Sequence, residues 1–371
     1  MLTAVQELLL KSALLPPDQA LTHWLAWLRL DAVSPETFSD RVRTLDADAQ
    51  RLLPLIYRNL EFTAAPLLPQ LRGHYLHTWR SNHNLLHMVY PVLKRLQAEG
   101  FEVMLLKGLP LALRFYRDLG VRPTADVDLL VPTHQAEAAL ALLTSPELGF
   151  RPTRYEFRHR RHLHAIHLLN REGRDLDLHW NLVSRHIYPG ADAPHWASKQ
   201  PLVLPNGQSV YSLSATHQIF HNLVHGFRWN EEYTIRWIPD TYQIYRQADD
   251  IDWSALLDLA EQYQMRIPVK TGLDLLRDLL GMELPATAAD RLARLAPTPA
   301  EQRYLRLLTP VKNPLHKGVR FLQKHYLAYQ LFGPRKSPLD FPAYLLSRFR
   351  QRVEWSRSDT YHLSQTPPPA P

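Results

Sequence analysis

The chain has 371 residues, a formal net charge of +7 and no cysteine. A chain of this length can bury a large core and fold as two or three units. Without cysteine it cannot form a disulfide, a cysteine zinc site or a thiol nucleophile, and a cytoplasmic location fits that composition. The positive charge favours nucleotides, nucleic acid or a membrane surface as partners, and a solvated basic surface explains it equally well.

Several classes of protein are disfavoured by the absence of their motifs. Glycine is scarce, and neither G-x-G-x-x-G nor G-x-x-x-x-G-K-[ST] occurs, which argues against the common phosphate loops. The apolar first fifteen residues include Glu7 and Lys11, so we expect an amphipathic helix there rather than a signal peptide. No run of about 18 uncharged apolar residues occurs, so no membrane-spanning helix is expected.

Helical periodicity extends from Leu2 to about Gly100, with breaks at Ser34-Pro35 and at residues 66–69. Residues 71–99 are predicted to form one long helix that ends at Gly100. Its predicted buried stripe consists of Leu85, Leu86, Met88, Val89, Val92, Leu93 and Leu96.

Short apolar runs alternate with helical segments after Gly100, which predicts an α+β module. The expected strands are residues 101–106, 127–131, 150–157, 162–170 and 175–180, and the expected helices are residues 109–119 and 135–143. The last two strands are predicted to form a hairpin across Arg171-Glu172-Gly173-Arg174.

A hairpin is expected over residues 202–213, with its turn at Asn206-Gly207, and helical periodicity resumes after it. Helices are expected at residues 216–227, 234–247, 253–263 and 268–280, with Asp252 as the N-cap of the third. The predicted division is a helical region (1–85), a mixed core (86–188), a helical substrate-side domain (189–300), a basic helical region (301–363) and a disordered tail (364–371).

Two carboxylates stand at the start of a predicted buried strand, in Asp126-Val127-Asp128. Residues two apart on a strand point to the same face, so Asp126 and Asp128 project together while Val127 and Leu129 face the core. A divalent cation such as Mg²⁺ relieves the repulsion between neighbouring carboxylates and shares its coordination with substrate phosphates. Taken alone, the tripeptide is explained more simply as a solvated strand end.

A second acidic strand follows, with Asp175, Asp177 and His179 on one side and apolar residues on the other. A third carboxylate beside Asp126 and Asp128 would complete a two-metal site. Such a site holds the attacking and leaving oxygens of an in-line phosphoryl displacement.

Lys107-Gly108 stands where a predicted strand ends and a helix begins. A helix N-terminus preceded by glycine offers backbone N–H groups to a phosphate, and Lys107 adds a positive charge. A plain strand-to-helix turn is the alternative interpretation.

The order of these features resembles the polymerase-beta-like nucleotidyltransferase superfamily, specifically its poorly characterised bacterial nucleotidyltransferases with flanking helical regions. The matching features are the Lys107-Gly108 turn, a helix ending near Tyr116, Arg122, Asp126-x-Asp128 on a strand, and Asp177-Leu178-His179-Trp180 on a later strand. The helical segment before Lys107 and the later segment with His225, Asp240 and Ile251-Asp252-Trp253 extend the resemblance to roughly residues 20–290. One departure is that Lys107-Gly108 replaces the usual glycine-serine, so no serine hydroxyl stands there to bind triphosphate.

The resemblance implies a nucleotidyltransferase core between N- and C-terminal helical regions. It also implies a magnesium-dependent enzyme that moves a nucleoside monophosphate from a nucleoside triphosphate such as ATP to an acceptor and releases pyrophosphate. The expected site residues are Asp126, Asp128 and Asp177 as metal ligands and catalytic residues, Lys107, Gly108 and Arg122 as phosphate-binding residues, and His179, His225 and Asp240 on the acceptor side.

Three histidines, His217, His221 and His225, are spaced four apart and share one helix face. A zinc site is disfavoured because no H-E-x-x-H motif occurs. We expect this stripe to line a cleft opposite Asp126 and Asp128, and hydrogen bonds inside the helical bundle are the alternative.

Asp240 has two open interpretations. It could act as a general base that reaches into the cleft, or it could pair with Arg236 one helical turn earlier. The ion pair is slightly favoured.

Two basic segments complete the candidates. His159, His162, His164 and His167 lie among arginines, which favours a basic strand near an anionic substrate over a solvated edge strand. Aromatic and basic residues mix over residues 316–357, where a packed amphipathic helix pair is favoured over contact with a membrane surface or RNA.

Two other functions compete with the enzyme: a non-catalytic nucleotide-binding regulatory protein, and an RNA-binding protein that uses the basic surface. The acid set argues against the first of these. The acceptor is open among a small molecule, a peptide, a protein side chain and an RNA end.

Overall fold

The computed structural model describes residues 2–153, 163–184, 186–227, 234–308, 314–332, 339, 341–342 and 344–346. The chain divides into two compact units, of which the first comprises residues 1–128 and 194–297 and the second comprises residues 129–193 and 298–371. The boundary falls inside one strand, β2 (Val127–Leu130), between Asp128 and Leu129. The predicted five-part division of the chain stays a prediction.

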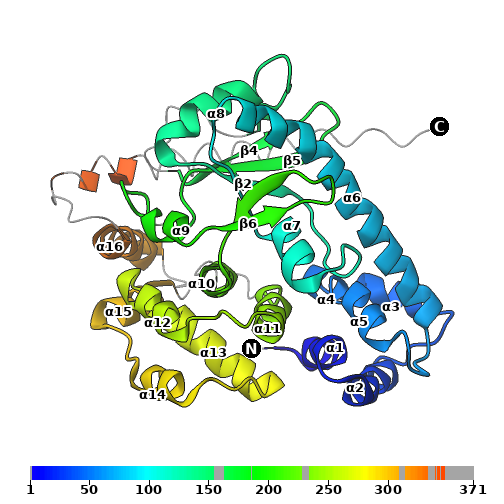
Figure 1. The fold of residues 1–371 in the computed structure, drawn as a ribbon. Helices are drawn as coiled ribbons and strands as arrows, with labels where there is room; N and C mark the ends of the chain where they lie inside the picture. Colours follow the sequence, from blue (N-terminus) through cyan, green and yellow to red (C-terminus); the bar gives the residue numbers. More distant parts are fainter. Residues whose placement is uncertain are drawn as a thin grey trace. The chain divides into compact units, whose positions relative to one another are not determined.

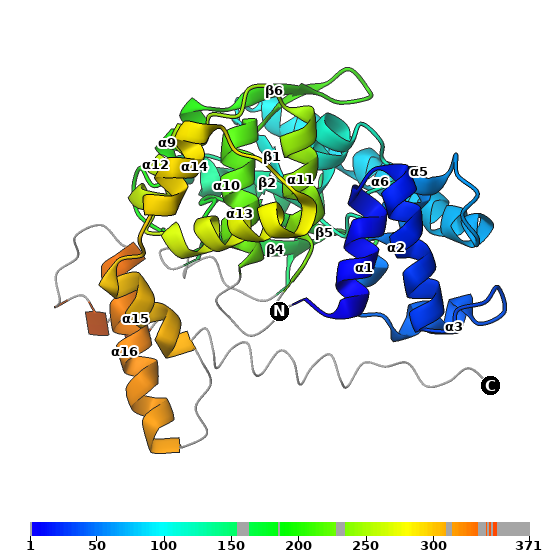
Figure 2. The ribbon, with the colours of Figure 1, turned by 90° about the horizontal axis from the view of Figure 1, so that it is seen from below.

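The first unit is mostly helical (Figure 1). Its helices are α1 (Ala4–Leu14), α2 (Pro17–Leu30), α3 (Phe38–Thr44), α4 (Ala47–Gln50), α5 (Leu53–Leu60), α6 (Leu68–Ala98), α7 (Gly108–Leu111), the π-helical η1 (Ala112–Tyr116), α10 (Ala215–Gly226), α11 (Trp237–Gln247), α12 (Trp253–Gln262), α13 (Arg266–Leu280) and α14 (Ala286–Arg294). The short α9 (Ala193–Ala197) begins at the boundary between the units. Figure 2 shows α1 and α2 side by side.

Local sequence signals explain where several of these helices begin and end. Thr3 and Gln6 form a capping box at the start of α1, and the Ser214 side chain caps α10 by accepting from the His217 amide. The Asp252 side chain accepts from the Ala255 amide, which confirms it as the N-cap of α12.

The long helix α6 matches the predicted helix over residues 71–99. Its buried apolar stripe is Leu85, Leu86, Val89, Val92, Leu93 and Leu96. Met88 is only partly buried, so that one member of the predicted stripe lies at its edge.

The second unit contains the helices η2 (Thr133–Gln135), α8 (Ala136–Leu143), α15 (Pro299–Leu308) and α16 (Pro314–Phe332). Figure 2 shows α15 and α16 packed as a pair. Near the end of α16, Tyr329 and Phe332 are buried, and Tyr329 contacts Phe341 and Tyr344 through its ring. These contacts agree with the expectation that the C-terminal aromatics pack together.

The other strands are β1 (Met104–Leu106), β3 (Arg151–Pro152), β4 (Ala165–Leu169), β5 (Asp175–His179), β6 (Gln200–Val203) and β7 (Ser209–Ser212). Within the first unit β1 pairs with β7 in parallel, and β6 and β7 form the predicted antiparallel hairpin. Within the second unit β4 pairs antiparallel with both β3 and β5, and the Val131 amide just after β2 donates to the His179 carbonyl at 3.0 Å.

The described strands follow the order β3-β4-β5-β2-β1-β7-β6 in one mixed seven-stranded sheet. Together with the helices, this sheet confirms the predicted α+β fold. No helix in the described ranges has both the length and the apolar character that crossing a membrane requires. The strand predicted over residues 150–157 is short where it is described, and His159 and His162 lie outside the described residues.

Candidate functional site

The turn between β1 and α7 is shaped by two residues with special backbone requirements. Lys107 has φ 52° and ψ −111°, a combination that side-chain-bearing residues rarely adopt. Such a conformation costs about 1–3 kcal/mol and persists only where the surroundings impose it. Gly108 approaches Thr124 so closely that an added Cβ would lie 2.2 Å from the Thr124 Cγ2 atom. Glycine at position 108 is therefore required by this contact.

The Lys107 side chain forms an ion pair with Asp128 on β2. The Asp128 side chain is 1% exposed and that of Lys107 is 23% exposed. A buried carboxylate needs a cation beside it, because desolvation without compensation is costly. The lysine that the sequence suggested as a phosphate ligand thus neutralises one of the two predicted metal ligands in this structure.

Asp240 on α11 holds Arg122 through a bidentate ion pair. Arg122 Nε donates to Asp240 Oδ1 at 2.7 Å and Nη2 donates to Oδ2 at 2.8 Å, while the Tyr116 hydroxyl donates to Oδ1 at 2.9 Å. Burial lowers the pKa of Arg122, but the Asp240 carboxylate outweighs burial and raises that pKa overall. Burial and Asp240 raise the pKa of Tyr116 well above its ordinary value. Arg122 therefore stays charged and Tyr116 stays neutral at neutral pH.

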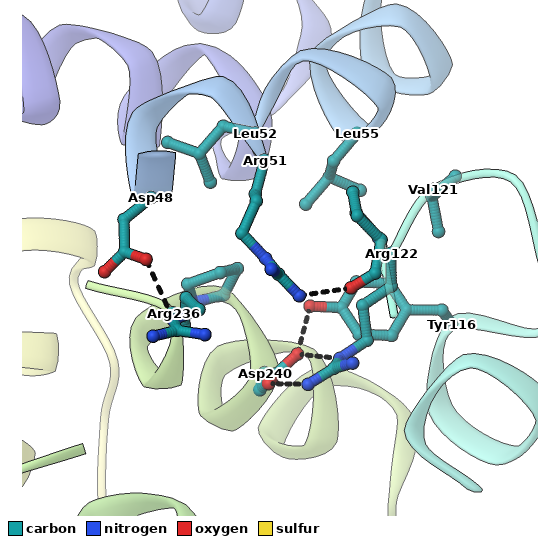
Figure 3. A pocket seen from close by; sticks show the side chains of 11 residues that line it. Asp48, Arg51, Leu52, Leu55, Tyr116, Val121, Arg122, Arg236 and Asp240 are labelled. Atoms are coloured by element: carbon teal, nitrogen blue, oxygen red, sulfur yellow. Dashed lines mark hydrogen bonds and ion pairs between the residues drawn. The ribbon is translucent and has the colours of Figure 1, made fainter. Parts of the chain in front are cut away.

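Two further arginines lie beside this pair, as Figure 3 shows. Arg51 at the end of α4 donates to the Pro123 carbonyl at 2.6 Å. Arg236, just before α11, pairs with Asp48 at 2.8 Å. The expected ion pair between Arg236 and Asp240 is therefore wrong, because each of the two finds its partner on another segment of the chain.

The first unit contains a cavity that collects most of the predicted site residues. From the mixed core it is lined by Lys107, Gly108, Leu111, Arg122, Thr124, Ala125, Asp126 and Asp128, and from the helices by Arg51, His221, Asn222, His225, Gly226, Thr234, Arg236, Trp237 and Asp240. Its volume is about 120 Å³, against about 30 Å³ for the smaller cavity drawn in Figure 3. Since one water needs about 10–15 Å³ by this measure, only the larger cavity has room for a ligand group.

The histidine stripe of α10 divides between this cavity and the protein core. His221 and His225 line the cavity together with Asp126 and Asp128. His217 instead faces His195, with the two Nδ1 atoms 2.7 Å apart. His195 is fully buried and stacks on Phe220, so this pair belongs to the helical core.

The buried histidine pair predicts that acid destabilises the protein. Burial lowers the pKa of His217 from 6.5 to about 4. The unfolded chain therefore takes up the proton first, and the free energy of unfolding falls as the pH drops from 6.5 to about 4, by up to about 3 kcal/mol. Above pH 6.5 this loss is absent.

Denaturant unfolding at pH 7 and pH 4.5 measures the effect. His217→Gln should lose less stability between these two pH values than the unmodified protein does. An identical loss in both proteins would assign the acid sensitivity to other groups.

The second unit carries the other acidic strand. On β5, Asp177 is partly buried and His179 is buried. Asp175 on the same strand pairs with His167 of β4, with 2.8 Å between Asp175 Oδ1 and His167 Nε2. His167 Nδ1 in turn lies 2.7 Å from the Thr153 hydroxyl. Asp175 thus has a structural partner within its own sheet.

The contributors to the cavity that were not anticipated from the sequence include Arg51, Arg236 and Asn222. Arg51 lies in the N-terminal helical region, far along the chain from the acidic strand, and no local pattern distinguishes it from other helical arginines. Arg236 was considered only as a partner of Asp240. The spacing of α10 would have placed Asn222 beside His225, one turn of the helix away.

Comparison with known proteins gives one family. A family model described as an uncharacterised nucleotidyltransferase matches residues 44–281. No curated protein gives a significant match. Among solved structures, the chain is similar to an antigenic nucleotidyltransferase-like protein from Paracoccidioides brasiliensis, with 20% identity, coverage of 55% of this chain and 96% of that chain, and a TM-score of 0.34. A likeness this distant carries no argument about the site.

Proposed function

Because the chain belongs to the family of uncharacterised nucleotidyltransferases, we propose that it transfers a nucleoside monophosphate from a nucleoside triphosphate to an acceptor and releases pyrophosphate. One observation carries the proposal: Asp126 and Asp128 line the same cavity as Lys107, Gly108 and Arg122. Acidic groups for a metal ion and cationic groups for phosphates are the two components that phosphoryl transfer needs in one place.

The carboxylates suit a divalent cation. Asp126, Asp128 and Asp177 are the residues that we propose to hold magnesium. Magnesium prefers hard oxygen ligands. The Lys107 ammonium group already pairs with the buried Asp128 carboxylate, so this position accommodates a positive charge. A bound divalent ion would stabilise the negative charge that develops on the phosphate oxygens.

The residues of the chain would bind and orient the reactants. Lys107, the Gly108 amide and Arg122 are proposed to bind the triphosphate. The acceptor oxygen forms a bond to the α-phosphorus, the bond from that phosphorus to its bridging oxygen breaks, and pyrophosphate leaves. Asp177 would accept the proton of the acceptor hydroxyl.

The acceptor would enter beside α10. His225 lines the same cavity as Asp126 and Asp128, which supports its placement on the acceptor side. His179 is proposed as a second acceptor-side residue. Asp240 also lines the cavity, but both of its carboxylate oxygens accept hydrogen bonds from Arg122 or Tyr116. We therefore assign Asp240 to the positioning of Arg122 rather than to proton transfer.

Replacing the two acids of β5 tests the assignment of the third carboxylate. Asp177→Asn should reduce magnesium-dependent nucleotidyl transfer by at least about 100-fold, the lower range for loss of a general base. Asp175→Asn is the matched control on the same strand face and should cost less than about threefold, because Asp175 serves His167. Release of pyrophosphate from each nucleoside triphosphate measures both variants. Equal losses, or a larger loss for the Asp175 variant, would remove Asp177 from the site.

A further inference from the structure

Three guanidinium groups from separate parts of the first unit converge on one wall of the cavity. Arg51 comes from the end of α4, Arg122 from the segment before β2, and Arg236 from the start of α11. All three line both the larger cavity and the smaller one in Figure 3, so they form the wall between the two cavities. We call this set the arginine wall.

Two carboxylates pair directly with members of the arginine wall. Asp240 binds Arg122 through both of its oxygens. Asp48 Oδ1 forms an ion pair with Arg236, at 2.8 Å from Nε, and Asp48 Oδ2 accepts from the Ile235 amide at 3.0 Å, so both carboxylate oxygens have a partner. The charge of Asp126, which lines the same cavity, also acts on Arg122, whereas no carboxylate of the described residues forms an ion pair with Arg51.

Arg51 differs from the other two arginines in this respect. Within the described ranges, its guanidinium group makes one hydrogen bond, to the Pro123 carbonyl, although the group has five N–H donors. Burial lowers the pKa of Arg51, and the positive charges of Arg122 and Arg236 lower it further. A partly buried cation among cations is stabilised when an anion binds beside it.

Arg236 also keeps donors for a ligand. Its side chain is 47% exposed, and its Nε atom lies 2.8 Å from Asp48 Oδ1. The two terminal nitrogens make no hydrogen bond to any of the described residues. Arg51 and Arg236 together thus line the cavity with two guanidinium groups, while the third, Arg122, is held by Asp240.

We propose that Arg51 and Arg236 of the arginine wall bind a phosphate group of one of the two substrates of the transfer reaction. The planar guanidinium fork matches phosphate oxygens, and charge-assisted hydrogen bonds of this kind are strong. The phosphate belongs either to the nucleotide or to a phosphorylated acceptor. This inference rests on the proposed function only in calling the ligand a substrate.

Binding of inorganic phosphate to the full chain, measured by titration calorimetry without metal or turnover, tests the inference. Arg51→Gln and Arg236→Gln should each weaken phosphate binding by at least about tenfold, as expected for loss of a charged hydrogen bond. The matched control is Arg43→Gln, whose side chain is 74% exposed on α3 and which should change the affinity less than about twofold. Thermal unfolding confirms that each variant is folded, and the second variant keeps the test valid if the first does not fold.

Absence of phosphate binding, or equal weakening by the control, overturns the inference. Saturating ATP then separates the two sources. Displacement of phosphate by ATP assigns the arginine wall to the nucleotide, and simultaneous binding assigns it to a phosphorylated acceptor. If the unmodified protein transfers nucleotide but does not bind phosphate, the inference about the arginine wall is refuted and the proposed function stands. If it binds phosphate but transfers no nucleotide, the proposed function is refuted and the inference stands.

Discussion

Asp128→Asn is expected to reduce magnesium-dependent nucleotidyl transfer by at least about 10³-fold, equivalent to about 4 kcal/mol of transition-state stabilisation. The Asp128 carboxylate is buried, so its charge cannot be replaced by solvent. Asparagine keeps the shape and a hydrogen-bond acceptor for Lys107 but removes the negative charge that a metal ion requires. Pyrophosphate release with saturating magnesium measures the effect.

The choice of asparagine follows from the Lys107 contact. Alanine at this position would leave the Lys107 ammonium group beside an empty, buried space, so a loss of activity could come from loss of folding. Asp40→Asn, at a side chain that is 77% exposed, is the control for removing one negative charge. An Asp128 variant that keeps more than a few per cent of the activity would show that this carboxylate is not a metal ligand.

Asp240→Ala is expected to lower the free energy of unfolding by about 3–5 kcal/mol, because it leaves the buried Arg122 charge without a partner. The side chains of this pair are only 7% and 15% exposed, so water cannot compensate for the lost carboxylate. Tyr116→Phe removes only one hydrogen bond to the same carboxylate and should cost about 1 kcal/mol. Urea unfolding monitored by circular dichroism measures both variants.

The double variant Arg122→Met/Asp240→Leu provides the control, since removing both charges should recover much of the stability lost in Asp240→Ala. A variant Asp240→Ala with unchanged stability and abolished transfer would contradict the positioning role. That result would return Asp240 to the role of a general base.

The features predicted correctly from the sequence are those determined by a few neighbouring residues, such as a strand alternation, a turn or a helix cap. The alternation in Asp126-Val127-Asp128 placed both acids at the start of a buried strand, and both line the cavity. The Asn206-Gly207 turn identified a hairpin, and Asp252 identified a helix start. Each of these signals depends on residues within a few positions of one another.

The arrangement of partners could not be predicted in the same way. Whether Asp240 pairs with Arg236 or Arg122 depends on tertiary packing, and helical spacing alone favoured the residue that turned out to bind Asp48. The ion pair between Lys107 and Asp128 joins two segments whose roles were expected to be separate. Charged groups have many geometrically acceptable partners, so local pattern does not select among them.

On helix α10, the sequence pattern predicted the environment of two histidines of the stripe but not that of the third. Spacing correctly placed His221 and His225 together on a polar face that lines the cavity. His217, one turn earlier, meets His195 instead, because α9 provides a buried partner there. The sequence pattern contains no sign of where along the helix the cavity ends.

The central claim is that the chain is a nucleotidyltransferase whose acidic residues serve the transfer. Incubation of the full chain with each α-labelled nucleoside triphosphate, magnesium and a cell extract tests it most directly. We predict that label moves from at least one nucleotide to an acceptor, that a metal chelator prevents this, and that Asp128→Asn prevents it as well. Nucleotide binding without transfer from any of the four nucleotides, or transfer that survives in the Asp128 variant, would contradict the account.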